Sequence, residues 1–451
     1  MRGAPARREP GSVVGMPSSG PSARRGTPPL RLHAWSDGAV VAIAFAALAS
    51  GFGQFGVVAA LGDVAREFGR VTHGATIADE GGLSGTQLGV GLAIIRLASL
   101  GSLPLIGLAD RFGRRAMLIA TLSIGLALTV ASAASFGYWS FVAIFAFGRP
   151  FLSATNALTQ VAAAEQTSSR GRASAVALTA AGYGFGAGLI AVIHSLASTS
   201  LGFRGICALA AVPLAAVPFL YKRIQEPDRF TIAEVAADRP LPVLGAVGPR
   251  FRRRLLVVAA LAFAISVITG PATSFVFLYA QNVLHQPGYV TAAMVVGAGL
   301  SGLIGLLAGR WLADRVGRRP TASFAMVVLS LLGVLTYEGS RPALICGYIL
   351  AVMAGSLLAP AVGSLLAELF PTSVRASVAG WWVAAGVLGA VAGLVAFGAV
   401  ADVGNRFESA AALTFLPAAL AAGLFWLLPE TRGREPEDLW PPVGQGVDAN
   451  S

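Results

Sequence analysis

The sequence predicts an all-α integral membrane protein whose twelve transmembrane helices form two pseudo-symmetric six-helix bundles. Three observations predict this fold class. Hydrophobic residues make up 55% of the 451 residues and charged residues only 12%, which is too apolar for a soluble protein. Twelve runs are long and apolar enough to cross a bilayer. Sequence motifs of the first half return in the second half, about 204 residues later.

Each predicted span is a mostly apolar run of about 20 residues, the length that a helix needs to cross a bilayer. Several contain glycine or proline, which membrane helices tolerate. The shortest run covers residues 321–337. In chain order the predicted spans are 39–61, 86–108, 117–137, 140–162, 173–196, 204–221, 255–280, 291–312, 321–337, 343–366, 376–400 and 408–428.

The internal repeat is clearest in two short basic loops. Residues 109–115 read Ala-Asp-Arg-Phe-Gly-Arg-Arg and residues 313–319 read Ala-Asp-Arg-Val-Gly-Arg-Arg, with an offset of 314 − 110 = 204. Each copy lies between two apolar runs. A repeat of this length indicates a duplicated fold, and a duplicated membrane bundle is typical of secondary transporters.

Charge and composition predict how the chain is divided. We expect a disordered cytoplasmic tail over 1–36, bundles over 37–221 and 255–430, a cytoplasmic linker over 222–254 and a cytoplasmic tail over 431–451. The longest external loop is expected at 62–85. With the N-terminus inside, 25 of the 33 Lys and Arg residues fall in internal loops and tails, as the positive-inside rule requires. Both termini are therefore expected in the cytoplasm, and the protein in the cytoplasmic membrane.

Several function classes are disfavoured. The net charge of +11 follows membrane topology, so it does not indicate a nucleic-acid partner. Cys207 and Cys346 lie in different halves, which gives no disulfide framework or metal cluster. No nucleophile–base pair or phosphate-binding loop is recognisable, so neither an enzyme nor a cofactor is expected. The expected partners are a small-molecule substrate, a coupling proton and membrane lipid, and the protein is expected to be a monomer.

The motifs resemble those of a known family. The Asp-Arg-x-Gly-Arg-Arg loops at 110–115 and 314–319 are similar to the signature loop of the major facilitator superfamily. Residues 368–375 resemble the Glu-x-x-Pro-x-x-x-Arg motif of its sugar and metabolite porters, and 428–433 resemble their Pro-Glu-Thr-Lys/Arg-Gly ending. The resemblance implies substrate binding between two rocking halves, with proton symport as the common mode. Ala187 replaces the proline of the drug antiporters' Gly-x-x-x-Gly-Pro motif, which favours uptake over drug extrusion.

The basic loops are predicted to form a cytoplasmic gate. A carboxylate at such a place can cap the N-terminus of a neighbouring helix and pair with arginine. Bonds of this kind between the halves would close the gate, whereas the alternative is a static loop that only sets orientation. The predicted gate residues are Asp110, Arg114, Glu165 and Arg172 in the first half and Asp314, Arg318, Glu368 and Arg375 in the second.

Two arginines are the strongest candidates for binding a substrate. Arg96 and Arg149 fall near the middle of their predicted spans, while the equivalent positions of the second half are uncharged. Charges inside a bilayer are costly and usually functional. Ser153, Asn156 and Gln160 follow Arg149 on one helical face, which indicates contact with another helix or a water-filled cavity.

The predicted substrate is a small organic anion such as a carboxylate, with Arg149 as its main counter-ion. Three alternatives stay open: a neutral sugar or polyol, drug efflux, and a membrane sensor on a degenerate transporter fold. A neutral solute would be held by Gln54, Asn156, Thr273 and Gln281. The full predicted binding set is Arg149, Arg96, Gln54, Asn156, Gln160, Thr273 and Gln281.

The carrier of a coupling proton is not evident from the sequence. No Asp or Glu lies in the middle of a predicted span. A proton would ride on Asp63, on His194 or on the substrate's own carboxylate, and uniport or anion exchange remain alternatives. His194, near the outer end of the fifth span, is expected at the membrane interface rather than as a proton carrier.

Overall fold

The computed structural model describes residues 38–70, 82–167, 172–224, 245, 247–404 and 406–433. All regular elements within these residues are helices, and twelve of them are long and apolar enough to cross a membrane. The predicted fold class is therefore confirmed, including the shortest span, which runs over Arg318–Thr336. The predicted tails and most of the predicted linker lie outside the described residues.

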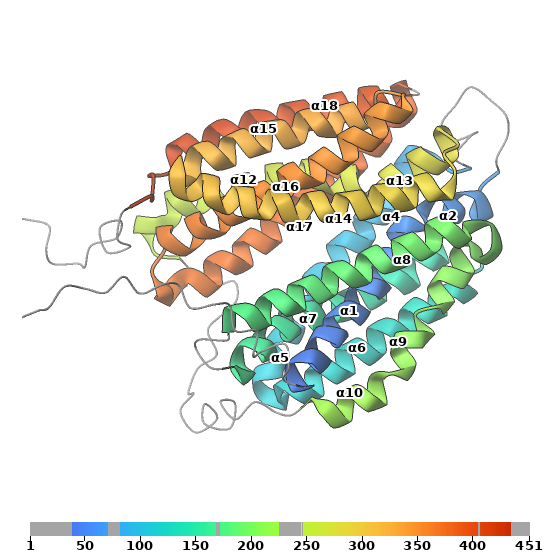
Figure 1. Ribbon diagram of the computed structural model, residues 1–451, viewed down its shortest axis with the longest axis horizontal. Coiled ribbons are helices and arrows are strands. Elements are labelled where there is room, and N and C mark those ends of the chain that lie inside the picture. Colours follow the sequence, from blue (N-terminus) through green and yellow to red (C-terminus); the bar gives the residue numbers. More distant parts are fainter. Residues whose placement is uncertain are drawn as a thin grey trace, which may run out of the picture.

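The first six spans form one bundle (Figure 1). At Gly202 the backbone is not helical, with a φ of 53°, so α8 contains the fifth span and the start of the sixth. The helices of this bundle are α1 (Gly38–Ala59), α2 (Leu61–Phe68), α4 (Gly85–Ala98), η2 (Ser99–Gly101), α5 (Ser102–Phe112), α6 (Arg114–Ala131), η3 (Ser132–Ala134), α7 (Tyr138–Gln166), α8 (Arg172–Ala208), α9 (Ala211–Ala215) and α10 (Val217–Arg223).

The last six spans form the second bundle. Its first span is irregular: α12 leads through a short helix into a π-helical turn, η4, at its far end. The helices are α12 (Pro249–Ser274), α13 (Val276–Leu278), η4 (Tyr279–Val283), α14 (Gly288–Arg315), α15 (Arg318–Thr336), α16 (Arg341–Leu369), α17 (Thr372–Gly404), α18 (Phe407–Ala419) and η5 (Leu420–Leu427).

Glycines set the closest helix packing in both bundles. On α8, a Cβ at Gly186 would overlap the carbonyl oxygen of Leu48 on α1. In the second bundle a Cβ at Gly393 of α17 would lie 2.5 Å from the carbonyl oxygen of Val267 on α12. Small residues allow helix backbones to approach this closely in lipid. The fifth span thus packs on the first as the eleventh packs on the seventh, which is the pseudo-symmetry expected from the repeat.

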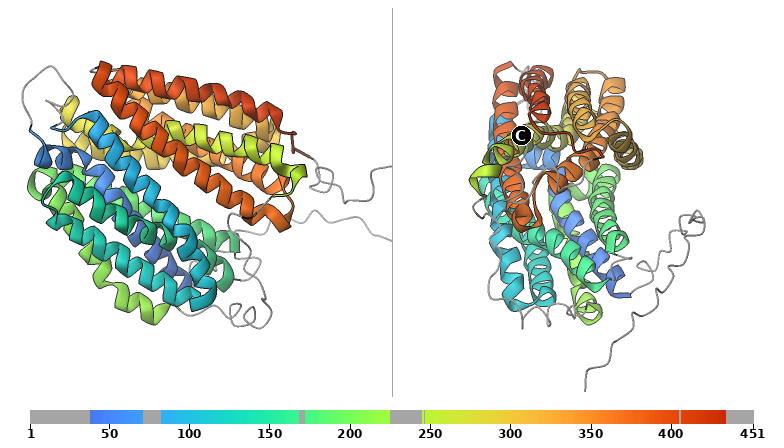
Figure 2. Two further views of the ribbon diagram at one scale, coloured as in Figure 1. Left: turned by 180° about the vertical axis from the view of Figure 1, so that it is seen from behind. Right: turned by 90° about the vertical axis from the view of Figure 1, so that its left-hand side faces the viewer.

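The two bundles meet at one end and diverge at the other. They lie together at the end that carries α2 and α13, called here the α2 end, at the right of Figure 1. At the opposite end, where α6 and α15 begin, they are separated; this is called the Arg114 end. Figure 2 shows the same arrangement from behind. Most of the contacts between the bundles pair α4 with α17 and α8 with α14.

The region predicted as an external loop begins with a helix. Residues Leu61–Phe68 form α2, directly after the first span. Its buried residues include Leu61 and Val64 and its exposed residues include Glu67, so it is amphipathic and packs one face against the bundle. The length rule for membrane spans does not detect a helix this short.

Candidate functional site

A cavity of about 330 Å³ lies between the two bundles. Four elements of the first bundle and two of the second contribute to it. Its walls are largely apolar, with aromatic rings from Phe55 and Phe145. The polar side chains that line it are Gln54, Arg96, Arg149, Tyr183, Thr269, Thr273 and Ser274. A mostly apolar pocket with a few convergent polar groups is the usual form of a small-molecule site.

Arg96 of α4 and Arg149 of α7 give the cavity its charge. Arg149 is 9% exposed, and its buried Nε has no hydrogen-bond partner. Arg96 has an exposed side chain that lines the cavity. The two guanidinium groups are close enough to repel each other. No acidic side chain lines this cavity, so its positive charge is not balanced by the described residues around it.

Gln54 of α1 is held in place by a chain of hydrogen bonds. Its Nε2 donates to Ser50 Oγ at 3.0 Å, and the Tyr183 hydroxyl of α8 donates to its Oε1 at 3.4 Å. Gln54 is only 2% exposed. The sequence analysis missed Tyr183, although a tyrosine directly after Gly182 of the tightly packed α8 face was an available signal.

The structure brings four of the seven predicted binding residues to this cavity: Gln54, Arg96, Arg149 and Thr273. The Thr273 hydroxyl donates to the Thr269 carbonyl oxygen at 2.8 Å. The other three lie elsewhere. Asn156 and Gln160 follow Arg149 along α7 toward the Arg114 end, and Gln281 lies in η4 at the α2 end.

In the first bundle, the gate residues with described side chains form an ion pair at the Arg114 end. Arg114 donates from Nε to Glu165 at 3.2 Å and from Nη2 to the other carboxylate oxygen at 3.3 Å. This bidentate geometry is the strong form of the arginine–carboxylate pair. The side chains of Asp110 and Arg172 lie outside the described part of the chain.

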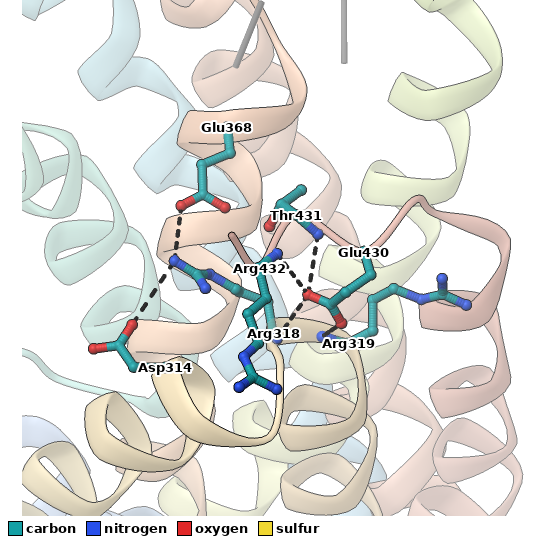
Figure 3. A network of polar contacts seen from close by, with 7 residues as sticks. All are labelled: Asp314, Arg318, Arg319, Glu368, Glu430, Thr431 and Arg432. Carbon is teal, nitrogen blue, oxygen red and sulfur yellow. Dashed lines mark hydrogen bonds and ion pairs between the residues drawn. The ribbon is translucent and has the colours of Figure 1, made fainter. Parts of the chain in front are cut away.

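In the second bundle the equivalent arginine, Arg318, joins a larger network (Figure 3). Arg318 pairs with Glu368 at 3.1 Å and with Asp314 at 3.7 Å. Arg375 donates from Nη2 to the Phe370 carbonyl oxygen at 3.3 Å.

Glu430 adds a helix cap that the sequence analysis did not assign. Its carboxylate accepts the backbone N–H groups of Arg318 at 3.0 Å and Arg319 at 3.1 Å, at the start of α15. It also accepts those of Thr431 and Arg432. Burial raises the pKa of Glu430, but these four backbone donors outweigh burial and leave it below its ordinary value.

Each of these bonds at the Arg114 end joins two residues of the same bundle. At the α2 end, described side chains join the two bundles: the Asp402 carboxylate of α17 accepts the N–H of Gly85 at 2.6 Å and of Thr86 at 2.8 Å. Asn282 Nδ2 donates to the Gly62 carbonyl oxygen at 3.1 Å. The described conformation is therefore closed at the α2 end.

His194 differs from its predicted environment. It is 0% exposed, and its Nε2 lies 2.8 Å from Asp63 Oδ2. The expectation of an interfacial histidine is wrong because α2 folds back over this part of α8 and buries the ring.

Comparison with known proteins decides the family. The family model of the Major Facilitator Superfamily matches residues 43–332 and 297–445. The chain belongs to this superfamily. Its family and its twelve apolar helices make this chain an integral membrane protein of the transporter kind.

The individual relatives of this protein are distant in sequence. A putative metabolite transport protein of Haemophilus influenzae is 25% identical over 289 residues, covering 60% of this chain and 69% of that protein. The inward-open conformation of the xylose transporter of E. coli aligns with a TM-score of 0.67 and 17% identity, over 89% of this chain and 98% of that one. A human organic anion transporter aligns with a TM-score of 0.59 and 17% identity, over 89% and 99%.

Proposed function

We propose that this protein is a secondary transporter that carries a small organic anion, a carboxylate, across the cytoplasmic membrane by alternating access. The observation that carries the proposal is the pair of arginines in the central cavity. Arg149 is almost fully buried, yet its guanidinium has no hydrogen bond or ion pair with a described residue. Burying a charge without a partner is costly, and a carboxylate in the cavity would supply the missing partner with bidentate geometry.

The orientation follows from the basic residues. The motif arginines of both halves lie at the Arg114 end, and an excess of Arg and Lys marks the cytoplasmic side. The α2 end then faces outside, where the Asp402 contacts close the molecule. Both termini are placed in the cytoplasm under this proposal, and the described conformation is the one that faces inward.

We further propose that transport is proton-coupled uptake. Moving one negative charge into a cell against an interior-negative potential costs about 2.3 kcal/mol per 100 mV. A proton carried in the same step cancels that charge, so symport removes this cost for a monocarboxylate. The structurally similar xylose transporter is described as a proton symporter, although at 17% identity this similarity shows the fold alone.

The second candidate is uptake of a sugar or polyol. It is favoured by the similarity to xylose transporters and by the amide of Gln54 and the hydroxyl of Tyr183 in the cavity. Against it, Asn156 and Gln281, two of the four predicted hydroxyl-binding residues, are not among the residues that line the cavity. A neutral solute would also leave both arginines without a counter-ion.

Thermal unfolding of the purified protein tests the proposal, because a ligand that binds only the folded state raises the melting temperature. The panel contains mono- and dicarboxylates, sugars, polyols and lipophilic cations. We expect stabilisation by a carboxylate that is lost in Arg149→Gln and kept in Arg310→Gln, the control arginine in α14 outside the cavity. Stabilisation by sugars alone, unchanged in Arg149→Gln, would favour the second candidate.

A further inference from the structure

A buried histidine–carboxylate pair joins α2 to α8 at the α2 end. His194 Nε2 and Asp63 Oδ2 are 2.8 Å apart. The imidazole is 0% exposed and the Asp63 side chain 13% exposed. The second ring nitrogen of His194, Nδ1, is also buried and has no hydrogen-bond partner in the described part of the chain. It is the atom that can accept a further proton when Nε2–H donates to the carboxylate.

Both residues of the pair are next in sequence to a contact between the bundles. The carbonyl oxygen of Gly62, directly before Asp63, accepts a hydrogen bond from Asn282 of the second bundle. The carbonyl oxygen of Ser195, directly after His194, packs so closely on Gly288 of α14 that a Cβ there would overlap it. The bond between His194 and Asp63 therefore lies beside two contacts that close the α2 end.

Few other titratable groups surround the pair. Arg66 lies 4.0 Å from Asp63, and its Nη2 donates to the Gln281 carbonyl oxygen of η4. Glu67 and Arg204 pair with each other at 3.2 Å in an exposed position.

The remaining neighbours are two phenols and one exposed histidine. The phenols of Tyr138 in α7 and Tyr279 in η4 donate to backbone carbonyl oxygens. His285, after η4, has an exposed side chain. The elements α1 and α13 contain no titratable side chain, so among the described residues at this end His194 is the buried imidazole.

We propose that Asp63 and His194 form a proton-binding site that controls closure of the α2 end. With neutral His194 the contact is a hydrogen bond to a carboxylate. A proton added from water to Nδ1, when the α2 end is open, turns it into an imidazolium–carboxylate pair, which adds a Coulomb attraction between the two opposite charges. The Nδ1–H of the imidazolium is then buried without a partner in the described part of the chain, and the attraction to Asp63 has to exceed that cost. Protonation thus favours the closed α2 end.

This inference rests on the alternating-access part of the proposed function. An outer end that closes when His194 is protonated makes proton binding a condition of the step that carries substrate inward. Loss of the proton is then required before the α2 end reopens. By linkage, proton binding from the outside therefore biases the equilibrium between the open and the closed α2 end.

Distance measurements between spin labels on full-length protein in lipid nanodiscs test the proposal. Phe136 lies at the α2 end of the first bundle and Glu338 at that of the second, and both are exposed. The labels are placed by Phe136→Cys and Glu338→Cys after Cys207→Ala and Cys346→Ala. We expect the ratio of the short, closed distance to the long, open distance to be roughly threefold to tenfold higher at about pH 5.5 than at about pH 8.

Single substitutions test which side chains cause the pH dependence of the closed-to-open ratio. His194→Gln and Asp63→Asn are expected to remove the pH dependence, whereas Glu67→Gln and His285→Gln are expected to keep it. Glu67→Gln breaks the other ion pair between the same two helices, and His285→Gln removes the exposed histidine. Equal populations at both pH values in the parent, or a pH dependence that survives His194→Gln, would overturn the proposal. Carboxylate stabilisation through Arg149 is measured separately, so it stands or falls independently of this result.

Discussion

The carboxylate of Asp402, near the end of α17, caps the first turn of α4 in the opposite bundle: its Oδ1 accepts the N–H of Gly85 at 2.6 Å. The two residues are 317 positions apart in the chain. A carboxylate is favourable at a helix N-terminus because it satisfies orphan N–H groups and the helix dipole. Here the cap belongs to another bundle, so it stabilises one conformation of the transporter rather than one helix.

Replacing this cap is expected to open the α2 end. Asp402→Asn keeps the shape but removes the charge, and should weaken the closed conformation by about 0.5–1 kcal/mol. That corresponds to a two- to fivefold larger open fraction, measured with the spin-label pair at Phe136 and Glu338. The control is Glu408→Gln, which removes an exposed acid of α18 at the same end. An unchanged open fraction in Asp402→Asn would mean that the cap does not set the equilibrium.

Close packing at the same contact should not tolerate a larger residue. A Cβ at Gly398 of α17 would overlap the carbonyl oxygen of Gly85, so Gly398→Val is expected to block closure of the α2 end. Uptake should fall at least about tenfold while the protein still folds, as checked by size-exclusion chromatography. Gly423→Val is the control, since no atom lies within 4 Å of a Cβ at that position. Normal uptake by Gly398→Val would contradict the need for this contact.

The cap by Glu430 predicts a pH-dependent contribution to stability. Because the pKa of Glu430 is lowered in the folded protein, its stabilising effect is present above the ordinary carboxyl value and disappears as pH falls through the lowered value. Glu430→Gln should lower the stability by roughly 0.5–1 kcal/mol at neutral pH. Melting temperatures of wild type and variant should converge as the pH falls below the ordinary carboxyl value. A gap that widens with acid would have the wrong sign for this account.

The fold was predictable because its signals are local. Each span is visible as an apolar run, and the repeated basic loops predict two equivalent halves. Arg96 and Arg149 were also predictable, since a charge within an apolar run is conspicuous wherever the helix packs. Asn156, Gln160 and Gln281 carry weaker signals: a polar residue on a membrane helix can serve packing at any depth, and these three lie outside the cavity.

The contacts that close the molecule were not predictable. Asp402 was visible only as an acid after the eleventh apolar run, and nothing local pairs it with Gly85. His194 and Asp63 are 131 residues apart, and their contact depends on α2, a helix too short for the spanning rule. Tyr183 reaches Gln54 from a neighbouring helix. Such partners are set by tertiary packing, which a single sequence does not encode in any local pattern.

The most direct test of the central claim is uptake of a radiolabelled carboxylate, chosen from the thermal panel, into proteoliposomes. Arg149→Gln should reduce uptake at least about tenfold, Arg149→Lys should restore part of it because lysine keeps the charge but not the bidentate geometry, and Arg310→Gln should transport as wild type. The account predicts this order of activities. Carboxylate uptake by Arg149→Gln at the wild-type rate would contradict it.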